Sequence, residues 1–551
     1  MRIVMLALVA VACRREKPPA PLPPLAHSAY AHYLEGKLAA YRDDWGAAAD
    51  ALADAATAAP DQPVVAVELA RAQHRAKRSD AARATLAAAR TKWPRHAQVW
   101  IASGDLLAQT APAEAIRAYR RAIELGHGDG AFEESAYLGL AKLESQDLAL
   151  ATLRQLVKRV PASIEGRYRL GQRLAIAKDV PAALLQMRKV LELDPDHIDA
   201  RLDLARGLRL QGKLDEAIEQ TRSAFDRSGQ ALDLAEELYY LLLEADDRVA
   251  AIDLLTLLDD DRSDTDALAI VARLDRGLGR LDEARAIAVR LGKLDADLGT
   301  IVVAELDLAS GDPAAAATRA LAIDPSAERF VEARRLAAQA FLAAGEPQRA
   351  VDALAPVRAT KPTDLDLATS AAFALADLGK LAEARAVLAP LGDGPGPTFA
   401  RARLADHAGD VATALAIVEP LVQAKPDPSG SVGPLNLAGY LLADSNQRLD
   451  DATRYLKRAR ELAPGDPAVL DSWGWLLFHK GDHRGAVRVL DRASRFAPRE
   501  AEILVHLAAA WIADGAPRTA AATLDRAGAL RPSRAVQQRI DALRTTLPPS
   551  P

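Results

Sequence analysis

The sequence predicts an all-α fold in which short helices pair into helix–turn–helix repeats that stack as an α-solenoid. A pattern of small and large residues with a period of about 34 recurs along nearly the whole chain. The composition is rich in alanine and leucine, and aromatic residues make up only 4% of it. Such a composition is typical of short helices that meet through close, small contacts. About fifteen repeats would fill roughly 510 positions, which leaves no room for a separate catalytic domain.

The repeat is clearest at 467–498, where the chain reads PAVLDSWGWLLFHKGDHRGAVRVLDRASRFAP. A tryptophan–glycine pair that ends at Gly474 falls in the middle of one amphipathic helix, and Gly481 breaks that helix. Leu490 then lies on the apolar stripe of a second helix, and the closing proline cannot continue it. We expect Gly474 and Ala486 to let the two backbones approach closely while Leu490 fills the gap between them.

This spacing resembles the tetratricopeptide repeat (TPR), whose pattern is W-x2-L-G-x2-Y…A-x3-F…P. The resemblance covers nearly the full length of the chain. It implies a right-handed α-solenoid superhelix in which the first helix of each repeat lines a concave groove that holds ligands. The block LNLAGYLLADSNQRLDDATRYLKRARELAP, followed by LDSWGWLLF, also resembles the closing repeats of TPR lipoproteins in Gram-negative bacteria. That second resemblance implies a scaffold or adaptor at the cell envelope.

Taken in order, the earlier repeats are marked by small residues at repeat spacing. The pattern weakens in the middle of the chain and sharpens again before two Gly/Pro-rich breaks, which are predicted to be hinges or domain boundaries. The markers are Gly36 and Ala48, Ala70 and Ala82, Gly104 and Ala115, Gly171 and Ala183, Ala205 and Ala217, Gly345 and Ala350, Gly379 and Ala384, and Gly409 and Ala414. The expected divisions are a repeat array at 28–426 that is irregular at 231–325, a Gly/Pro/Ser linker at 427–433, a C-terminal block of repeats at 434–532, a capping helix at 533–547 and a disordered tail at 548–551.

The N-terminal segment 1–13 combines one basic residue, a short apolar run and a small residue before Cys13, the only cysteine in the chain. It resembles a bacterial lipoprotein signal, in which the cysteine becomes the lipidated first residue of the mature protein. The Pro-rich stretch 14–27 then reads as an extended tether. We therefore expect an outer-membrane lipoprotein that faces the periplasm, because Arg14 after the cysteine favours that membrane by the habit of the family. The alternative is an incidental cysteine in a frayed N-terminus, and hence a cytoplasmic protein.

The charge balance and the missing motifs argue against nucleic-acid binding, enzymatic activity and metal binding. Lysine and arginine total 70 against 75 acidic residues, so the net charge of −5 gives no basic field for nucleic acid. No Gly-rich phosphate loop follows a strand, and G-x-S-x-G is missing. His479 and His483 have the spacing of a zinc protease pair but lack the glutamate after the first histidine. We therefore expect no enzymatic activity, no cofactor and no metal.

The candidate ligand groove lies in the C-terminal block. Residues at i, i+4, i+7 and i+8 of the helix after Pro467 share one face, and by resemblance that face lines the groove. The preceding repeat adds three residues at equivalent places. Together they form an aromatic surface with polar groups, suited to a peptide segment or a sugar ring. The alternative is that the two large rings pack against a neighbouring repeat. The seven residues are Asn436, Tyr440, Asp444, Asp471, Trp475, Phe478 and His479.

Two further sets fall on predicted helix faces. An N-terminal aromatic set either binds a ligand or simply covers the open side of the first repeat. A set of arginines on presumed groove positions could select an acidic peptide or an anionic polymer. The alternative is a solvated face whose arginines are satisfied by nearby carboxylates. The two sets are Tyr30, Tyr33, Lys37 and Tyr41, and Arg206, Arg209, Arg273, Arg276 and Arg335.

The expected function is that of a scaffold or adaptor that binds protein partners in its groove, at the cell envelope and in assembly or export. Two alternatives remain open at this point. One is a factor that grips a polysaccharide along the aromatic groove, and the other is a soluble cytoplasmic adaptor.

Overall fold

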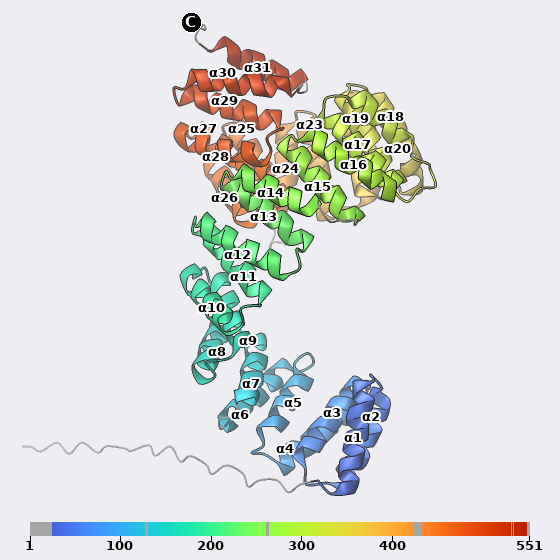
Figure 1. Ribbon diagram of the computed structural model, residues 1–551, viewed down its shortest axis with the longest axis vertical. Helices are drawn as coiled ribbons and strands as arrows, with labels where there is room; N and C mark the ends of the chain where they lie inside the picture. The colour runs from blue at the N-terminus through green and yellow to red at the C-terminus, as the bar shows by residue number, and fades with distance from the viewer. Residues whose placement is uncertain are drawn as a thin grey trace, which may run out of the picture. The chain divides into compact units, whose positions relative to one another are not determined.

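The computed structural model describes residues 25–126, 130–259, 264–423, 432–530, 532 and 534–547. Within these residues the regular elements are α-helices and one short 3-10 helix, and no strand occurs among them. The all-α prediction is therefore confirmed. The chain divides into two compact units, Met1–Gly229 (unit 1) and Gln230–Pro551 (unit 2), which are described separately (Figure 1).

In unit 1 the described helices form antiparallel pairs joined by short turns, and each pair contacts the next. We refer to the two members of a pair as the first and second helix of a repeat. The helices are α1 (His27–Tyr41), α2 (Trp45–Ala58), α3 (Pro63–Arg75), α4 (Ser79–Lys92), α5 (Ala97–Leu107), α6 (Pro112–Leu125), α7 (Gly130–Leu143), α8 (Gln146–Arg159), α9 (Ile164–Ile176), α10 (Val180–Leu193), α11 (Ile198–Leu210) and α12 (Leu214–Arg227).

Unit 2 is also built of helix pairs, and among its described residues the last helix is not followed by a second member. It begins with α13 (Leu232–Glu244), α14 (Arg248–Asp259), α15 (Thr265–Leu278), α16 (Leu281–Leu294), α17 (Ala296–Ala309), α18 (Pro313–Leu321), α19 (Phe330–Ala343), α20 (Pro347–Thr360), α21 (Leu365–Asp377) and α22 (Leu381–Leu388), which runs into the 3-10 helix η1 (Ala389–Leu391). It ends with α23 (Pro395–His407), α24 (Val411–Gln423), α25 (Val432–Asp444), α26 (Leu449–Leu462), α27 (Pro467–His479), α28 (His483–Phe496), α29 (Ala501–Ala513), α30 (Pro517–Ala529) and α31 (Arg534–Thr545).

The boundaries of the helices follow from local chemistry, as the repeat of α27 and α28 shows. Pro467 begins α27, where its missing N–H costs nothing, and Asp466 caps the free amides of that first turn. Gly481 turns the chain at φ 82° between the two helices. The Asp482 side chain then accepts a hydrogen bond from the Gly485 amide at 2.8 Å and starts α28. The turn between paired helices is thus encoded within a few residues.

The apolar core runs from each repeat into the next. One cluster in unit 2 joins Val418 of α24, Leu435 of α25, Leu456 of α26 and Leu476 of α27, each less than 5% exposed. No single helix pair encloses this cluster, so the stability of a repeat depends on its neighbours. The stretch 231–325, whose sequence pattern is weak, also folds as helix pairs, α13 to α18.

Unit 2 also contains contacts between helices that are far apart in the sequence. The loop end of α13 meets α28, where Glu244 forms an ion pair with Arg492. Next to it, Asp246 Oδ2 lies 3.4 Å from a guanidinium nitrogen of Arg495. Arg499 donates a hydrogen bond to the carbonyl of Ala309, the last residue of α17. Three arginines in and just after α28 therefore bind the ends of α13 and α17, which come much earlier in unit 2.

Several predicted features lie partly or wholly outside the described residues. They are the signal segment 1–13 with Cys13, most of the tether 14–27, most of the linker 427–433 and the tail 548–551. Among the residues that are described, no helix is both long and apolar enough to cross a membrane.

Candidate functional site

A cavity of about 680 Å³ opens on the first helices of the C-terminal repeats of unit 2. Its walls come from α21, α23, α25, α27, α29 and α31, which are the first helices of successive repeats and the capping helix at the end of unit 2. The residues that line it are Phe373, Phe399, Arg403, Asp406, His407, Gly433, Asn436, Leu437, Tyr440, Ala468, Asp471, Ser472, Glu502 and Arg539. The cavity is thus built from equivalent faces of several repeats.

Three of the seven predicted groove residues line this cavity: Asn436, Tyr440 and Asp471. The side-chain oxygen of Asn436 is buried and accepts no hydrogen bond from the residues that the structure describes, so its hydrogen-bonding capacity is unused. Burial, followed by the carboxylates of Asp444 and Glu502, raises the pKa of Tyr440 well above its ordinary range. The phenol is therefore a neutral donor and acceptor at physiological pH.

The other four predicted residues form a packed group beside the cavity. The indole of Trp475 donates a hydrogen bond to Asp444 at 2.9 Å. Its ring stacks on Phe478 at 4.7 Å between centroids, and His479 meets it edge-on at 4.8 Å. Phe478 packs against a core cluster that includes Leu507 of the next repeat. For Phe478 the structure therefore shows the alternative, in which the ring packs against a neighbouring repeat.

His506 joins this group to the cavity and was missed by the sequence analysis. It is 2% exposed, and its Nδ1 lies 3.0 Å from both carboxylate oxygens of Asp471. Because an ionised carboxylate only accepts hydrogen bonds, Nδ1 is the donor. The imidazole also stacks on Trp475 at 4.2 Å. Asp471 therefore fixes α29 against α27, and its role is at least partly structural.

Sequence reasoning also missed the acidic and basic residues of the cavity. Asp406 and Phe399 lie on α23, one repeat length before Tyr440 and Gly433. Extending the predicted groove face by one repeat toward the N-terminus would have found them. The break between these repeats in the sequence hid that relation. Arg539 lies on the capping helix, where no groove face was expected.

Among the carboxylates that line the cavity, Asp406 is the one whose negative charge is least offset by nearby positive groups. Burial, together with the negative charges of Asp444 and Glu502, raises its pKa above the ordinary value, and nearby His407 and Arg403 offset this only in part. Arg403 lies over the ring of Phe373 at 5.1 Å. The arrangement places a half-buried acidic group beside aromatic walls.

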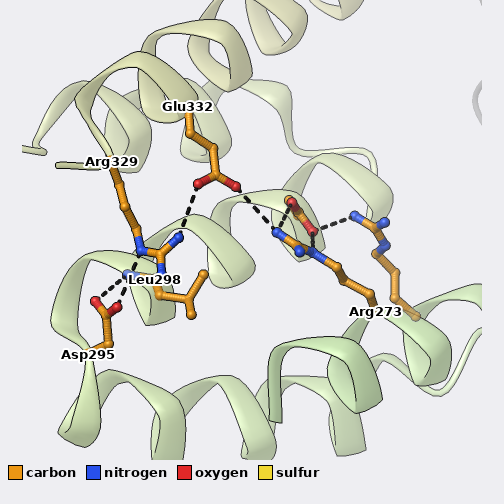
Figure 2. A network of polar contacts seen from close by, with 7 residues as sticks. Arg273, Asp295, Leu298, Arg329 and Glu332 are labelled. Atoms are coloured by element: carbon orange, nitrogen blue, oxygen red, sulfur yellow. Dashed lines mark hydrogen bonds and ion pairs between the residues drawn. The ribbon is translucent and has the colours of Figure 1, made fainter. Parts of the chain in front are cut away.

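The predicted arginine groove in unit 2 is largely neutralised by carboxylates, as Figure 2 shows. Arg273 makes two hydrogen bonds to Glu305, at 3.0 and 3.1 Å, and Arg276 reaches the same carboxylate at 3.0 Å. Glu332 lies 3.4 Å from both Arg273 and Arg329, and so links the two guanidinium groups (Figure 2). These contacts agree with a face whose arginines are satisfied within the chain.

The remaining predicted residues are distributed over both units. Arg335 of unit 2 lies 3.3 Å from Asp366. In unit 1, Arg206 of α11 lies 3.4 Å from Asp203, and Arg209 lies on the same helix. Of the N-terminal aromatic set, Tyr41 is 89% and Tyr30 52% exposed. Tyr33 packs against the first apolar cluster, and Lys37 forms an ion pair with Glu68 at 2.6 Å.

No family model matches the chain. A curated relative, the TPR repeat-containing protein PA4667 of Pseudomonas aeruginosa, is 34% identical over 83 residues. The matched stretch is therefore similar to part of a TPR protein, and the observed succession of helix pairs fits the same all-α repeat architecture. The matched stretch covers 15% of the chain and 14% of the relative, so the remainder of that relative is not represented in the match.

Several solved structures are similar to this chain at low identity and with low TM-scores. The Cut9–Hcn1 hetero-tetramer of the APC/C is 13% identical, covers 94% of this chain and 96% of its own, and has a TM-score of 0.32. PilW, a type IV pilus biogenesis factor, is 18% identical over 39% of this chain and 99% of its own, with a TM-score of 0.32. YrrB, described as having an unusual peptide-binding site, is 22% identical over 34% and 98%, with a TM-score of 0.29.

Proposed function

We propose that this TPR chain is a non-enzymatic adaptor that holds an extended segment of a partner protein in the cavity of unit 2. The observation that carries the proposal is that one cavity combines Asn436, whose buried oxygen accepts no hydrogen bond from any described residue, with the rings of Phe399 and Tyr440. An extended peptide supplies backbone N–H groups and apolar side chains at short intervals. An N–H group of the peptide would donate to Asn436, and its apolar side chains would pack on the rings of Phe399 and Tyr440.

The second candidate ligand from the sequence is a polysaccharide. Its binding would require a sugar ring to stack on the indole of Trp475. Phe478 and His506 already stack on that ring, at 4.7 and 4.2 Å. A sugar would have to displace one of them from a packed position. This favours a peptide ligand.

The proposal is tested by panning a random peptide display library on the purified full chain and measuring the affinity of a selected peptide by calorimetry. We expect Asn436→Ala and Tyr440→Ala to weaken binding at least about tenfold, because both remove walls of the cavity. Tyr41→Ala is the matched control, since Tyr41 is exposed in unit 1 and should leave the affinity unchanged. If Tyr41→Ala weakens binding and the two cavity variants do not, the ligand site is in the N-terminal repeats instead. If none of the three variants weakens binding, the peptide does not bind in the cavity.

We also propose that the adaptor acts at the bacterial cell envelope, in assembly or export, as an outer-membrane lipoprotein. The support for this is the N-terminal sequence, where Cys13 follows a short apolar run. Metabolic labelling with a palmitate analogue should mark the wild type and leave Cys13→Ala unmarked. An unlabelled wild type would favour the cytoplasmic alternative.

A further inference from the structure

Most charged groups on the cavity walls have partners within the chain. The carboxylate of Asp471 faces His506, and Glu502 accepts a hydrogen bond from Arg539 at 2.8 Å. Asp444, just outside the lining, accepts the indole N–H of Trp475. These pairs account for the carboxylates of α25, α27 and α29.

Asp406 of α23 differs from the other carboxylates. Within the described part of the chain its carboxylate accepts no hydrogen bond and forms no ion pair. The guanidinium of Arg403 lies over Phe373 instead of pairing with it. Asp444 and Glu502 add negative potential at the same place, and the carboxyl is half-buried. A positive charge brought into the cavity would therefore be attracted to Asp406 without breaking an existing pair.

Arg539 provides independent evidence that this cavity accommodates a guanidinium. It comes from the capping helix α31, which follows the last complete repeat. Its guanidinium lines the cavity and donates a hydrogen bond to Glu502 at 2.8 Å. Burial lowers the pKa of Arg539, but contacts with Tyr440, Glu502 and Asp444 more than offset this. The chain thus places one of its own cations among these acidic and aromatic groups.

We propose that the cavity receives a lysine or arginine side chain of the partner segment, with Asp406 as its counter-ion. The rings of Phe399 and Tyr440 then lie along the apolar stem of that side chain, because lysine and arginine bury their methylene groups against apolar surface. Arg539 occupies the neighbouring position and competes with the ligand for Glu502. This proposal rests on the proposed function, since it names the kind of segment that the adaptor holds.

The test sequences the peptides that a random display library yields on the purified full chain. Wild type should enrich lysine or arginine at one position several-fold over the input library, and Asp406→Asn should lose that enrichment. Asp450→Asn is the matched control, because Asp450 is fully exposed on α26, away from the cavity lining. Replacing the selected lysine by norleucine, which keeps the stem and removes the charge, should weaken binding to wild type at least about tenfold.

Arg539→Ala gives a second measurement that does not depend on the fold of the Asp406 variant. The lysine peptide should bind this variant several-fold more tightly than wild type, and the norleucine peptide should bind both equally. Circular dichroism checks that each variant keeps its helices.

The outcomes separate the two proposals. Selected peptides without a cationic position, or equal affinity of the lysine and norleucine peptides, would overturn the cationic site and leave the adaptor function standing. Weaker binding of the lysine peptide to Arg539→Ala would overturn the competition and with it the assigned position of the ligand. A library that yields no binding peptide would overturn both proposals.

Discussion

The side chain of Leu490 occupies the space that a side chain on Gly474 would need. A Cβ added to Gly474 would lie 2.5 Å from Cγ of Leu490, which is fully buried. The first and second helices of this repeat therefore approach as closely as the sequence pattern predicts, and for the predicted reason.

Gly474→Ala is expected to destabilise its repeat by about 1–3 kcal/mol, because the added methyl group overpacks the contact with Leu490. Leu490→Ala alone should cost about 2–5 kcal/mol through the cavity it leaves. The double variant should lose less than the sum of the two, since each change offsets the other. Hydrogen exchange of α27 and α28 in the full chain measures all three.

The control is Gly528→Ala in α30, where an added Cβ would meet only Arg544, at 3.7 Å. Here alanine should be neutral or should stabilise the helix by up to about 1 kcal/mol. Equal losses at Gly474 and Gly528 would show that helix propensity, and not packing, sets the effect.

The ion pair between Glu244 and Arg492 should couple the first and last parts of unit 2. The Glu244 side chain is 6% exposed and the Arg492 side chain 33% exposed, so solvent screens this pair less than a surface pair. A double-mutant cycle with Glu244→Ala and Arg492→Ala should give a coupling energy of about 1–3 kcal/mol. The measurement is hydrogen exchange of α13.

The exposed pair of Asp525 and Arg544, at 2.8 Å, is the control and should couple by less than about 1 kcal/mol. Equal coupling in both pairs would contradict the prediction.

Lys178 carries backbone strain that glycine would remove. It turns the chain between α9 and α10 at φ 64°, the conformation that Gly345 adopts at φ 74° in the corresponding turn between α19 and α20. Lys178→Gly should therefore stabilise its repeat by about 1 kcal/mol, and Gly345→Ala should destabilise its repeat by a similar amount. Hydrogen exchange of the flanking helices reads out both changes. Loss of stability in Lys178→Gly would show that the gain in unfolded-chain entropy outweighs the strain.

Asp275 should make unit 2 less stable as the pH rises. Burial raises its pKa from 3.8 to about 6, although its carboxylate lies 3.2 Å from Arg280. Between about pH 4 and 6 the folded chain therefore binds more protons at this site than the unfolded chain, so the free energy of unfolding falls through that window. Above about pH 6 the loss is complete.

Asp275→Asn removes this ionisation and isolates its effect. Relative to the variant, wild type should lose up to about 3 kcal/mol of stability between pH 4 and 7. Urea unfolding of both proteins over that range gives the difference. Parallel pH profiles would show that Arg280 compensates the buried charge fully.

Local features of the fold could be predicted from the sequence because they depend on residues within one repeat. The turn at Gly481, the close approach at Gly474 and the shared face of Asn436 and Tyr440 all follow from helical spacing. Helical spacing within one repeat could not predict the cavity, because the cavity combines faces of several repeats. The partner of Asp471 is His506, one repeat further on, and the contact depends on the rotation between the two repeats.

The contact between α13 and α28 could not be predicted for a related reason. It depends on the small rotations that successive repeats accumulate, and no single motif encodes their sum. The weak sequence pattern at 231–325 has a physical reason, because leucine-rich helices such as α13 bury large side chains such as Leu238 and Leu242.

The ion pair of Glu244 and Arg492 has a consequence for the synthesis of this protein. The two residues are 248 positions apart, and Glu244 is translated first. At about 5–20 residues per second, α13 leaves the ribosome on the order of 10–50 s before Arg492 is made. During that interval the surface of α13 that α28 later covers is open to other chains and to chaperones. Unit 2 therefore completes its fold only when its last repeats have been translated.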